Sequence, residues 1–306
     1  MSKTKEIKPI DVLCVGDTVV DIWIKLNEET SHTYTNENGP WLALPFATKI
    51  PYEETEVQPA HGNAANAAVA MSRLGLRVAY QTYVGGDQMG RETIRVFQKE
   101  KVDTRFITIE NEEMTNINFL VSFKAERTIL TKHNDFDYEW PHFRKKEMPR
   151  WLYFSSLSEN AADYHDEIAD WLEAHPEVKM AFQPGTWQMK AGVERLKRIY
   201  ARAEVVIMNR QEAAFVTGGS TKDLHDLFDR LHSYGPKMAV ITDGPDGAYA
   251  SDGVKRFKMP LYPDPKPPVE RTGAGDAYAS TMVAALVVGH DLESALQWAP
   301  INSMNV

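Results

Sequence analysis

"RWLYFSSL" (residues 150–157), "AADYHDEIADWLEAH" (161–175) and "VKMAFQPG" (178–185) follow one another in the middle of the chain. The first and third pieces are short apolar runs typical of buried strands, and the second has the spacing of an amphipathic helix. The same alternation continues as far as residue 244. Because strands that alternate with helices form βαβ units, the pattern predicts an α/β fold with a doubly wound, mainly parallel sheet flanked by helices.

The N-terminal third departs from this alternation. An apolar run over residues 10–26 predicts a buried strand that ends near Gly16, followed by a second extended piece that carries Asp21. Residues 27–59 are polar and punctuated by proline, which leaves a mobile loop or a small β excursion as alternatives. "INFLVSF" (117–123) and "RTILTK" (127–132) predict a pair of strands.

Composition limits the classes of function. The 306 residues carry a net charge of -9, which argues against non-specific nucleic-acid binding because that needs a basic surface. No apolar stretch approaches the ~20 residues that span a bilayer, and the charged start of the chain is not a signal peptide. The single cysteine, Cys14, lies in an apolar run and is expected to be a small buried hydrophobe. We therefore expect a cytoplasmic enzyme or binding protein with neither a nucleic-acid nor a membrane partner.

One stretch near the C-terminus suggests chemistry. In "VERTGAGDAYAS" (269–280), Gly273, Ala274 and Gly275 precede Asp276 at the start of a predicted helix. Backbone N–H groups at a helix N-terminus attract anions, and small residues let an anion approach closely. Asp276 could then take a proton from a hydroxyl that attacks a phosphoryl group. This stretch alone favours the plainer alternative, a turn followed by an ordinary first-turn carboxylate, because it matches neither a Walker A loop nor a dinucleotide fingerprint.

Four further segments accompany this turn in a fixed order. They are "HGNAANAAVAMSRLG" (61–75), "VGGDQMGRE" (84–92), "MNRQE" (208–212) and "VITDGPDGAYASDG" (240–253), before "ERTGAGD" (270–276). Taken together, over nearly the whole chain, they resemble the ribokinase-like (PfkB) carbohydrate kinase family. The resemblance implies one ribokinase-like domain over residues 1–306, with a small β-sheet lid formed by about residues 18–60 and 113–133. It also implies transfer of the γ-phosphoryl group of ATP, with Mg²⁺, to a hydroxymethyl group of a sugar or nucleoside.

The resemblance assigns roles on the substrate side. It makes Asp276 the catalytic base and the turn of Gly273, Ala274 and Gly275 the anion hole. Asp21 on a lid strand would bind sugar hydroxyls, and the remaining substrate contacts would come from Gly62, Asn63 and Asn66. Without that context, Asp21 would be a solvated strand end and Asn63 a helix cap.

The resemblance also assigns a nucleotide side. Asn209 and Glu212 would organise phosphate and Mg²⁺, the glutamate through water, which suits a metal that keeps several waters. Thr242, Gly244 and Gly247 would line the phosphates and ribose of ATP. The plainer alternative for Glu212 is an ordinary acidic residue in the first turn of a helix.

Several positions depart from the family pattern. Glu270-Arg271 stands where Asp-Thr is usual, which counts against the monovalent cation that several members bind and makes Arg271 a candidate contact to ATP phosphate. His61 stands where a glycine is usual, and it either contacts substrate or is structural. "QPGTW" (183–187) replaces an Asp-x-Asn-x-Arg motif, so this strand supplies no arginine. The sequence stops at "NSMNV", in what reads as a helix, so we expect either a truncated chain or an adenine pocket open on one side.

The sequence is compatible with more than one function. A sugar kinase and a nucleoside kinase would share Asp276 but differ in the lid, where Trp23, Trp41 and Phe46 could form a slot for a base or simply pack the lid. A non-catalytic sugar- or nucleotide-binding protein is a third reading, which the retained Asp276 argues against. A dinucleotide-dependent oxidoreductase is disfavoured because "GDTVVD" rather than a glycine-rich turn follows the first strand. Lid faces in this family often pair, so a homodimer through the lid is the expected assembly.

Overall fold

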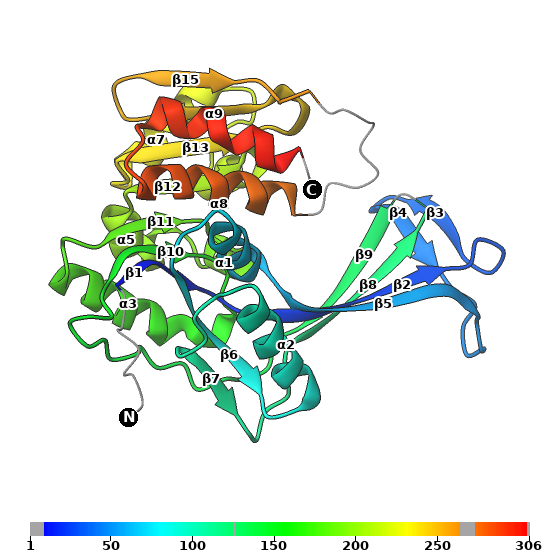
Figure 1. The fold of residues 1–306 in the computed structure, drawn as a ribbon. Coiled ribbons are helices and arrows are strands. Elements are labelled where there is room, and N and C mark those ends of the chain that lie inside the picture. The colour runs from blue at the N-terminus through cyan, green and yellow to red at the C-terminus, as the bar shows by residue number, and fades with distance from the viewer. Residues whose placement is uncertain (1–8, 125, 264–272, 305–306) are drawn as a thin grey trace, which may run out of the picture.

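A single large sheet forms the body of the protein in the computed structural model, which describes residues 9–124, 126–263 and 273–304 (Figure 1). Within these residues the sheet has nine strands. In spatial order they are β15 (Arg256–Met259), β14 (Ala248–Ser251), β13 (Met238–Thr242), β12 (Val205–Asn209), β11 (Lys179–Phe182), β10 (Pro149–Phe154), β1 (Ile10–Val15), β6 (Val78–Gly85) and β7 (Ile107–Glu110).

Strand direction changes only at one side of this sheet. Every neighbouring pair from β7 to β13 is parallel, whereas β14 and β15 pair antiparallel. The predicted doubly wound, mainly parallel α/β fold is therefore confirmed. The parallel strands bring their carboxyl ends to one edge, which is where ligands bind in such sheets.

Helices cover both faces of the sheet. Residues of α1, α2, α8 and α9 share one hydrophobic core with the sheet, and residues of α3, α5, α6 and α7 share the other. The α-helices of the described residues are α1 (Asn63–Arg73), α2 (Gln88–Lys99), α3 (Ala162–Ala174), α4 (Thr186–Ala191), α5 (Val193–Arg202), α6 (Arg210–Thr217), α7 (Leu224–Ser233), α8 (Ala274–Val287) and α9 (Leu292–Ser303). Among them, no helix is long and apolar enough to cross a membrane.

The central strand β1 illustrates why these runs are apolar throughout. Val12 and Cys14 pack in one core, while Leu13 and Val15 pack in the other, and all four are fully buried. A strand covered on both faces has no solvent-facing side, so it does not alternate between polar and apolar residues. Cys14 is indeed a buried free thiol, as its surroundings in the sequence predicted.

A smaller sheet projects from the body (Figure 1). In the described residues it has four strands in the order β5 (Tyr52–His61), β2 (Val19–Leu26), β8 (Ile117–Phe123) and β9 (Glu126–Lys132). The predicted pair over 117–132 is the antiparallel hairpin of β8 and β9. The polar stretch 27–59 is a β excursion, since it contains the hairpin of β3 (His32–Asn36) and β4 (Gly39–Ala43) and most of β5. We call β2, β5, β8 and β9 the lid sheet.

Candidate active site

Asp276 lies in the first turn of α8 and is nearly buried, with 8% of its surface exposed. Gly273 caps the helix with φ 83°, a left-handed conformation that glycine adopts without the strain a side chain would add. Beyond the backbone of α8 itself, a Cβ atom built on Gly275 would meet no atom of the described residues within 4 Å, so there is room beside the start of the helix. The start of a helix with such room is the kind of place where a small anion binds.

Three side-chain amides surround the Asp276 carboxylate. Asn63 Nδ2 donates to Oδ1 at 2.8 Å, and Asn66 Nδ2 donates to Oδ2 at 2.8 Å. Gln183 Nε2 donates to Oδ1 at 3.1 Å. Asn63 and Asn66 both belong to α1, so the structure brings two of the predicted substrate residues onto the predicted base. Neutral amides hold the carboxylate here, which leaves its negative charge uncompensated by any of these three partners.

Gln183 reaches Asp276 because of its place at the edge of the sheet. It follows β11 directly, and its backbone N–H donates to the carbonyl of Phe154 at the end of β10. Tyr153 of β10 donates its buried hydroxyl to Gln183 Oε1. The sequence pointed to Gln183 only as a departure from a family motif, although its position just after a strand was a usable signal.

Asn209 and Glu212 form a reciprocal cap on α6. Glu212 N donates to Asn209 Oδ1, and Asn209 N donates to Glu212 Oε2, both at 2.8 Å. Glu212 is thus an acidic residue in the first turn of a helix, the alternative that the sequence allowed beside a role at phosphate and Mg²⁺. Burial raises the pKa of the Glu212 carboxyl, the backbone hydrogen bond from Asn209 lowers it, and the charge of Asp276 raises it further. Glu212 therefore feels the electrostatic field of the candidate base.

A cavity of about 490 Å³ opens beside this turn. Its wall combines the ends of β12 and β13 with the start of α8. Four of the residues predicted for ATP line it, Asn209, Thr242, Gly244 and Gly247, together with Ala274 and Gly275 of the predicted anion hole. Glu212, also predicted for ATP, is not among its lining residues. Gly247 has φ 88°, and a Cβ there would lie 2.2 Å from the carbonyl oxygen of Met259, so only glycine fits this wall. Arg271 and Glu270 lie outside the described residues.

Asp21 sits on the lid sheet in a second polar cluster. Asn118 Nδ2 donates to Asp21 Oδ1 at 3.0 Å, and His61 Nδ1 lies 3.7 Å from Asp21 Oδ2. Burial raises the pKa of Asp21, while His61 and Asn118 act in the opposite direction. Asp21 is thus a partly buried carboxylate within β2, not a solvated strand end. His61, which contacts Asp21, directly precedes Gly62 and Asn63 in the chain.

Gly62 forms the junction between the lid sheet and α1. Its φ is 110°, and a Cβ there would lie 2.8 Å from the carbonyl oxygen of Asp17. This close approach requires glycine, and it sets the start of α1 so that Asn63 and Asn66 point toward Asp276. Asn63 itself is the first helical residue and does not act as the cap.

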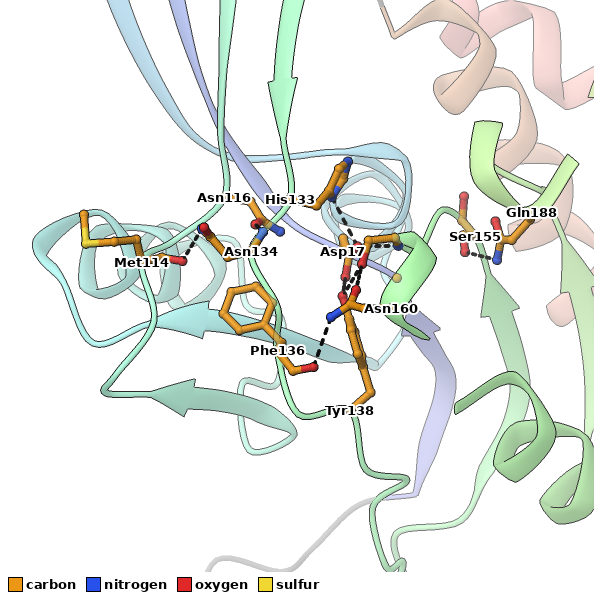
Figure 2. A network of polar contacts seen from close by, with 12 residues as sticks. Asp17, Met114, Asn116, His133, Asn134, Phe136, Tyr138, Ser155, Asn160 and Gln188 are labelled. Carbon is orange, nitrogen blue, oxygen red and sulfur yellow. Dashed lines mark hydrogen bonds and ion pairs between the residues drawn. The ribbon is translucent and has the colours of Figure 1, made fainter. Parts of the chain in front are cut away.

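Asp17 anchors the base of the lid, a contact that the sequence reading missed. It is 5% exposed and accepts hydrogen bonds from the Tyr138 hydroxyl at 2.7 Å and the Ser158 N–H at 2.8 Å. His133, just after β9, places Nδ1 3.6 Å from Asp17 Oδ2. Figure 2 shows His133 and Tyr138 pointing toward Asp17 from the chain that returns from the lid. This anchor ties the return from β9 to the end of β1.

The side chains of the described residues do not form a protein-only metal site. Within the described ranges, no group of three or more His, Cys, Asp or Glu residues could hold a metal ion. Mg²⁺ does not need such a cluster, because it is commonly held by one or two carboxylates, water and substrate phosphates. The residues present therefore fit a Mg²⁺ ion carried mainly by a nucleotide, since Asp243 and Asp246 line the cavity and Glu212 lies close enough to Asp276 for that charge to raise its pKa.

The family of this chain follows from a comparison with known proteins. A family model described as pfkB family carbohydrate kinase matches residues 10–300. The chain belongs to this family. It is therefore a phosphotransferase of the carbohydrate-kinase type, as the resemblance in sequence implied.

Relatives of this pfkB kinase act on different acceptors, judged by their names. A 5-dehydro-2-deoxygluconokinase from Clostridium tetani is 26% identical over 97% of this chain and 86% of its own length. A nucleoside kinase from Methanothermobacter thermautotrophicus is 25% identical over 94% of this chain and 86% of its own length. The relatives thus support kinase activity and leave sugar and nucleoside acceptors both represented.

Solved structures confirm the fold of the pfkB kinase. Ribokinase from Arabidopsis thaliana, solved with ribose and ATP, superposes with a TM-score of 0.77 at 16% identity. The match covers 96% of this chain and 91% of that one. A nucleoside kinase from Methanocaldococcus jannaschii superposes with a TM-score of 0.75 at 19% identity, over 96% and 90% of the two chains. At these identities the comparison establishes the ribokinase-like fold with its separate small sheet.

Proposed function

We propose that this chain transfers the γ-phosphoryl group of ATP to a hydroxymethyl group of a small carbohydrate, with Asp276 as the general base. The observation that carries the proposal is the buried Asp276 carboxylate, held by three neutral amides at the start of α8, where the described residues leave room beside Gly275. A base must stay charged, aimed and close to the site where negative charge develops. These contacts meet those requirements.

The proposed reaction has a simple balance of atoms. Asp276 accepts the proton of the substrate hydroxyl, and the oxygen of that hydroxyl forms a bond to the γ-phosphorus. The bond from the γ-phosphorus to the bridging oxygen of ADP breaks, and ADP leaves with its electron pair. The N–H groups of the turn at Gly273, Ala274 and Gly275 stabilise the charge on the transferred group. When bound, Mg²⁺ would offset charge on the phosphates, with Glu212 orienting its water.

The lid supports a sugar as the acceptor. Asp21, with Asn118 and His61, offers the carboxylate and amide groups that bind several hydroxyls. Trp41 stacks with Tyr34 on the β3–β4 hairpin, at the end of the lid far from the body (Figure 1), and Phe46 is 96% exposed. Trp41 therefore stands away from Asp276, and the exposed ring of Phe46 gives no support for a slot that holds a nucleoside base.

A nucleoside kinase remains the alternative because of one residue. Trp23 is two positions from Asp21 on β2, so both side chains lie on the same face of the lid sheet. Its indole N–H donates to Gln58 Oε1 at 3.1 Å. The faces of the indole ring could then stack against a nucleoside base. A panel of ribose, fructose, 5-dehydro-2-deoxygluconate, 2-keto-3-deoxygluconate, adenosine and cytidine with ATP, read as ADP release, separates the two.

The test of the mechanism uses Asp276→Asn and the acceptor that the panel identifies. We expect kcat to fall by on the order of 10²–10⁴-fold, the contribution of one positioned base. Asp291→Asn is the matched control, because Asp291 caps α9 through Ser294 N and asparagine caps equally well. Near-normal turnover in Asp276→Asn would refute this mechanism, and no ADP release with any acceptor would favour a non-catalytic binding protein.

We also propose that the kinase forms a homodimer through the lid sheet. Val57, Ile22, Phe119 and Leu130 are directly opposite one another on β5, β2, β8 and β9, so they form one apolar row. Phe119 is 41% exposed, Val57 46% and Leu130 56%. This row lies on the face opposite Asp21, because neighbouring residues of a strand point to opposite faces. An exposed apolar row of this kind is typical of a contact surface.

A further inference from the structure

Gln183 has two different partners, one at each end of its amide. Its Nε2 donates to Asp276 Oδ1 at 3.1 Å, and its Oε1 accepts the hydroxyl of Tyr153. Reversing the amide would place its oxygen against the carboxylate, which can only accept hydrogen bonds. The Tyr153 hydroxyl therefore favours the one orientation in which Gln183 is a donor to the base.

Tyr153 is suited to hold that orientation. It is fully buried in β10, one residue before the end of the strand. Burial raises the pKa of its hydroxyl well above the usual range, and the negative charge of Asp276 raises it further. The hydroxyl therefore stays protonated and remains a donor. Tyr153 and Ala181 are register partners in β10 and β11, and Gln183 lies two residues beyond Ala181 on the same face.

The hydrogen bonds on Asp276 are unequal between its two oxygens. Among residues 9–124, 126–263 and 273–304, Oδ1 accepts side-chain hydrogen bonds from both Asn63 and Gln183, whereas Oδ2 accepts one from Asn66 alone. A carboxylate oxygen has two acceptor sites, so these described contacts occupy Oδ1 fully and leave one site on Oδ2. The carboxylate is held at one oxygen and has its spare acceptor capacity at the other.

We propose that Gln183, oriented by Tyr153, is a positioning residue that fixes the Asp276 carboxylate so that Oδ2 receives the substrate proton. This inference rests on the proposed function of Asp276 as the base. Gln183 does not contact the substrate in this scheme. It acts through Asp276, in a chain of hydrogen bonds that runs from β10 through the end of β11 to α8.

Two variants break this chain at different links. Gln183→Leu removes the donor, and Tyr153→Phe removes only the hydroxyl that orients it. We expect each to lower kcat roughly 10- to 100-fold, which corresponds to losing one hydrogen bond to a charged group, with the KM for ATP unchanged. The dependence of kcat/KM on pH should also differ from wild type, because the lost hydrogen bond is one to the proton acceptor itself. Tyr153 and Glu212, whose titrations both respond to Asp276, are the other groups to follow in that profile.

Tyr80→Phe is the matched control for Tyr153→Phe. Tyr80 is also fully buried in the same hydrophobic core, and its hydroxyl donates one hydrogen bond, to the carbonyl of Gly16 at 3.1 Å. Both variants should lower the unfolding temperature by a similar amount, but only Tyr153→Phe should change kcat and the pH profile. A merely structural role for Tyr153 would make the two variants alike in all three measurements.

The outcomes separate this inference from the proposed function. If wild type turns over, Asp276→Asn does not, and Gln183→Leu matches wild type in kcat and pH profile, then the positioning role is wrong and the base assignment stands. If Asp276→Asn turns over normally, both are wrong. Gln183→Glu adds a third arm: it places a second carboxylate against the base, so its loss of kcat should exceed that of Gln183→Leu.

Discussion

At the scale of single residues, His133 and Asp17 form an ion pair whose strength depends on pH. The hydrogen bond and the charge of Asp17 raise the pKa of His133 above its ordinary value, and partial burial opposes this. Asp17 also accepts from Tyr138 and the Ser158 N–H, so its carboxylate stays in place whether or not His133 is charged. The titrating member of the pair is therefore the histidine.

His133→Gln tests this pair. A histidine whose folded pKa is raised stabilises the fold fully below its unfolded pKa of about 6.5, and that contribution is lost as pH rises through the folded pKa. We expect wild type to lose unfolding free energy between about pH 6 and pH 8, and His133→Gln to lose less over the same interval. Urea unfolding at several pH values measures the difference. Equal pH dependence in both proteins would contradict the assignment.

The residue scale also shows where sequence reading stopped. Asp276 and the two asparagines of α1 could be predicted as site residues because they stand in short, ordered motifs. Their contact with one another could not, since the hydrogen-bonded atoms belong to residues 210 or more positions apart. Asp17, His133 and Tyr138 carry no motif, and their association depends on how the lid returns to the body. In the sequence, Gln183 stood out only because it belongs to a segment that departs from a family motif. In the structure it is the third side chain that donates a hydrogen bond to Asp276.

At the scale of elements, the start of α6 has one observed role and one proposed role, and the two can be separated. Asn209 and Glu212 cap the helix reciprocally, and the proposed function also has Glu212 orient a water of Mg²⁺. Glutamine suits the same position of a capping box, because its side-chain oxygen can accept the same N–H. A substitution can therefore remove the charge and keep the cap.

We expect Glu212→Gln to leave the unfolding temperature nearly unchanged and to raise the Mg²⁺ concentration that gives half-maximal rate. Asn209→Ala is the opposite control, since it removes a cap and should cost about 1 kcal/mol of stability. Thermal unfolding and a Mg²⁺ titration of the initial rate give both quantities. An unchanged Mg²⁺ requirement in Glu212→Gln would mean that Glu212 only caps α6.

Several elements could be predicted from the sequence and several could not. The strands from β10 to β13 and the hairpin of β8 and β9 are uniform apolar or alternating runs, and they form where expected. The stretch 27–59 stayed ambiguous because its strands are mostly exposed, so they lack the apolar alternation of a half-buried strand. Tertiary pairing with β2, rather than local pattern, makes β5 a strand.

At the scale of the whole molecule, the apolar row on the lid sheet predicts how two copies meet. Leu130→Lys places a charge within the proposed contact, at the β9 end of the apolar row, where burying it without a partner is costly. We expect this variant to shift the mass in solution from dimer to monomer, measured by light scattering. Val254→Lys is the matched control, because Val254 is 91% exposed in a turn of the body. A Leu130→Lys protein with the mass of wild type would contradict dimerisation through this face.

The hydrogen bonds on Asp276 also concern the order in which the molecule is made. Its three donors are separated from it by 213, 210 and 93 residues along the chain. Contacts of such long range close only after large loops have been ordered, whereas single helices and hairpins form locally and early. If Asp276 is the base, as proposed, activity requires the N-terminal, central and C-terminal thirds of the chain to have docked. Recovery of activity in refolding would then report complete assembly rather than recovered secondary structure.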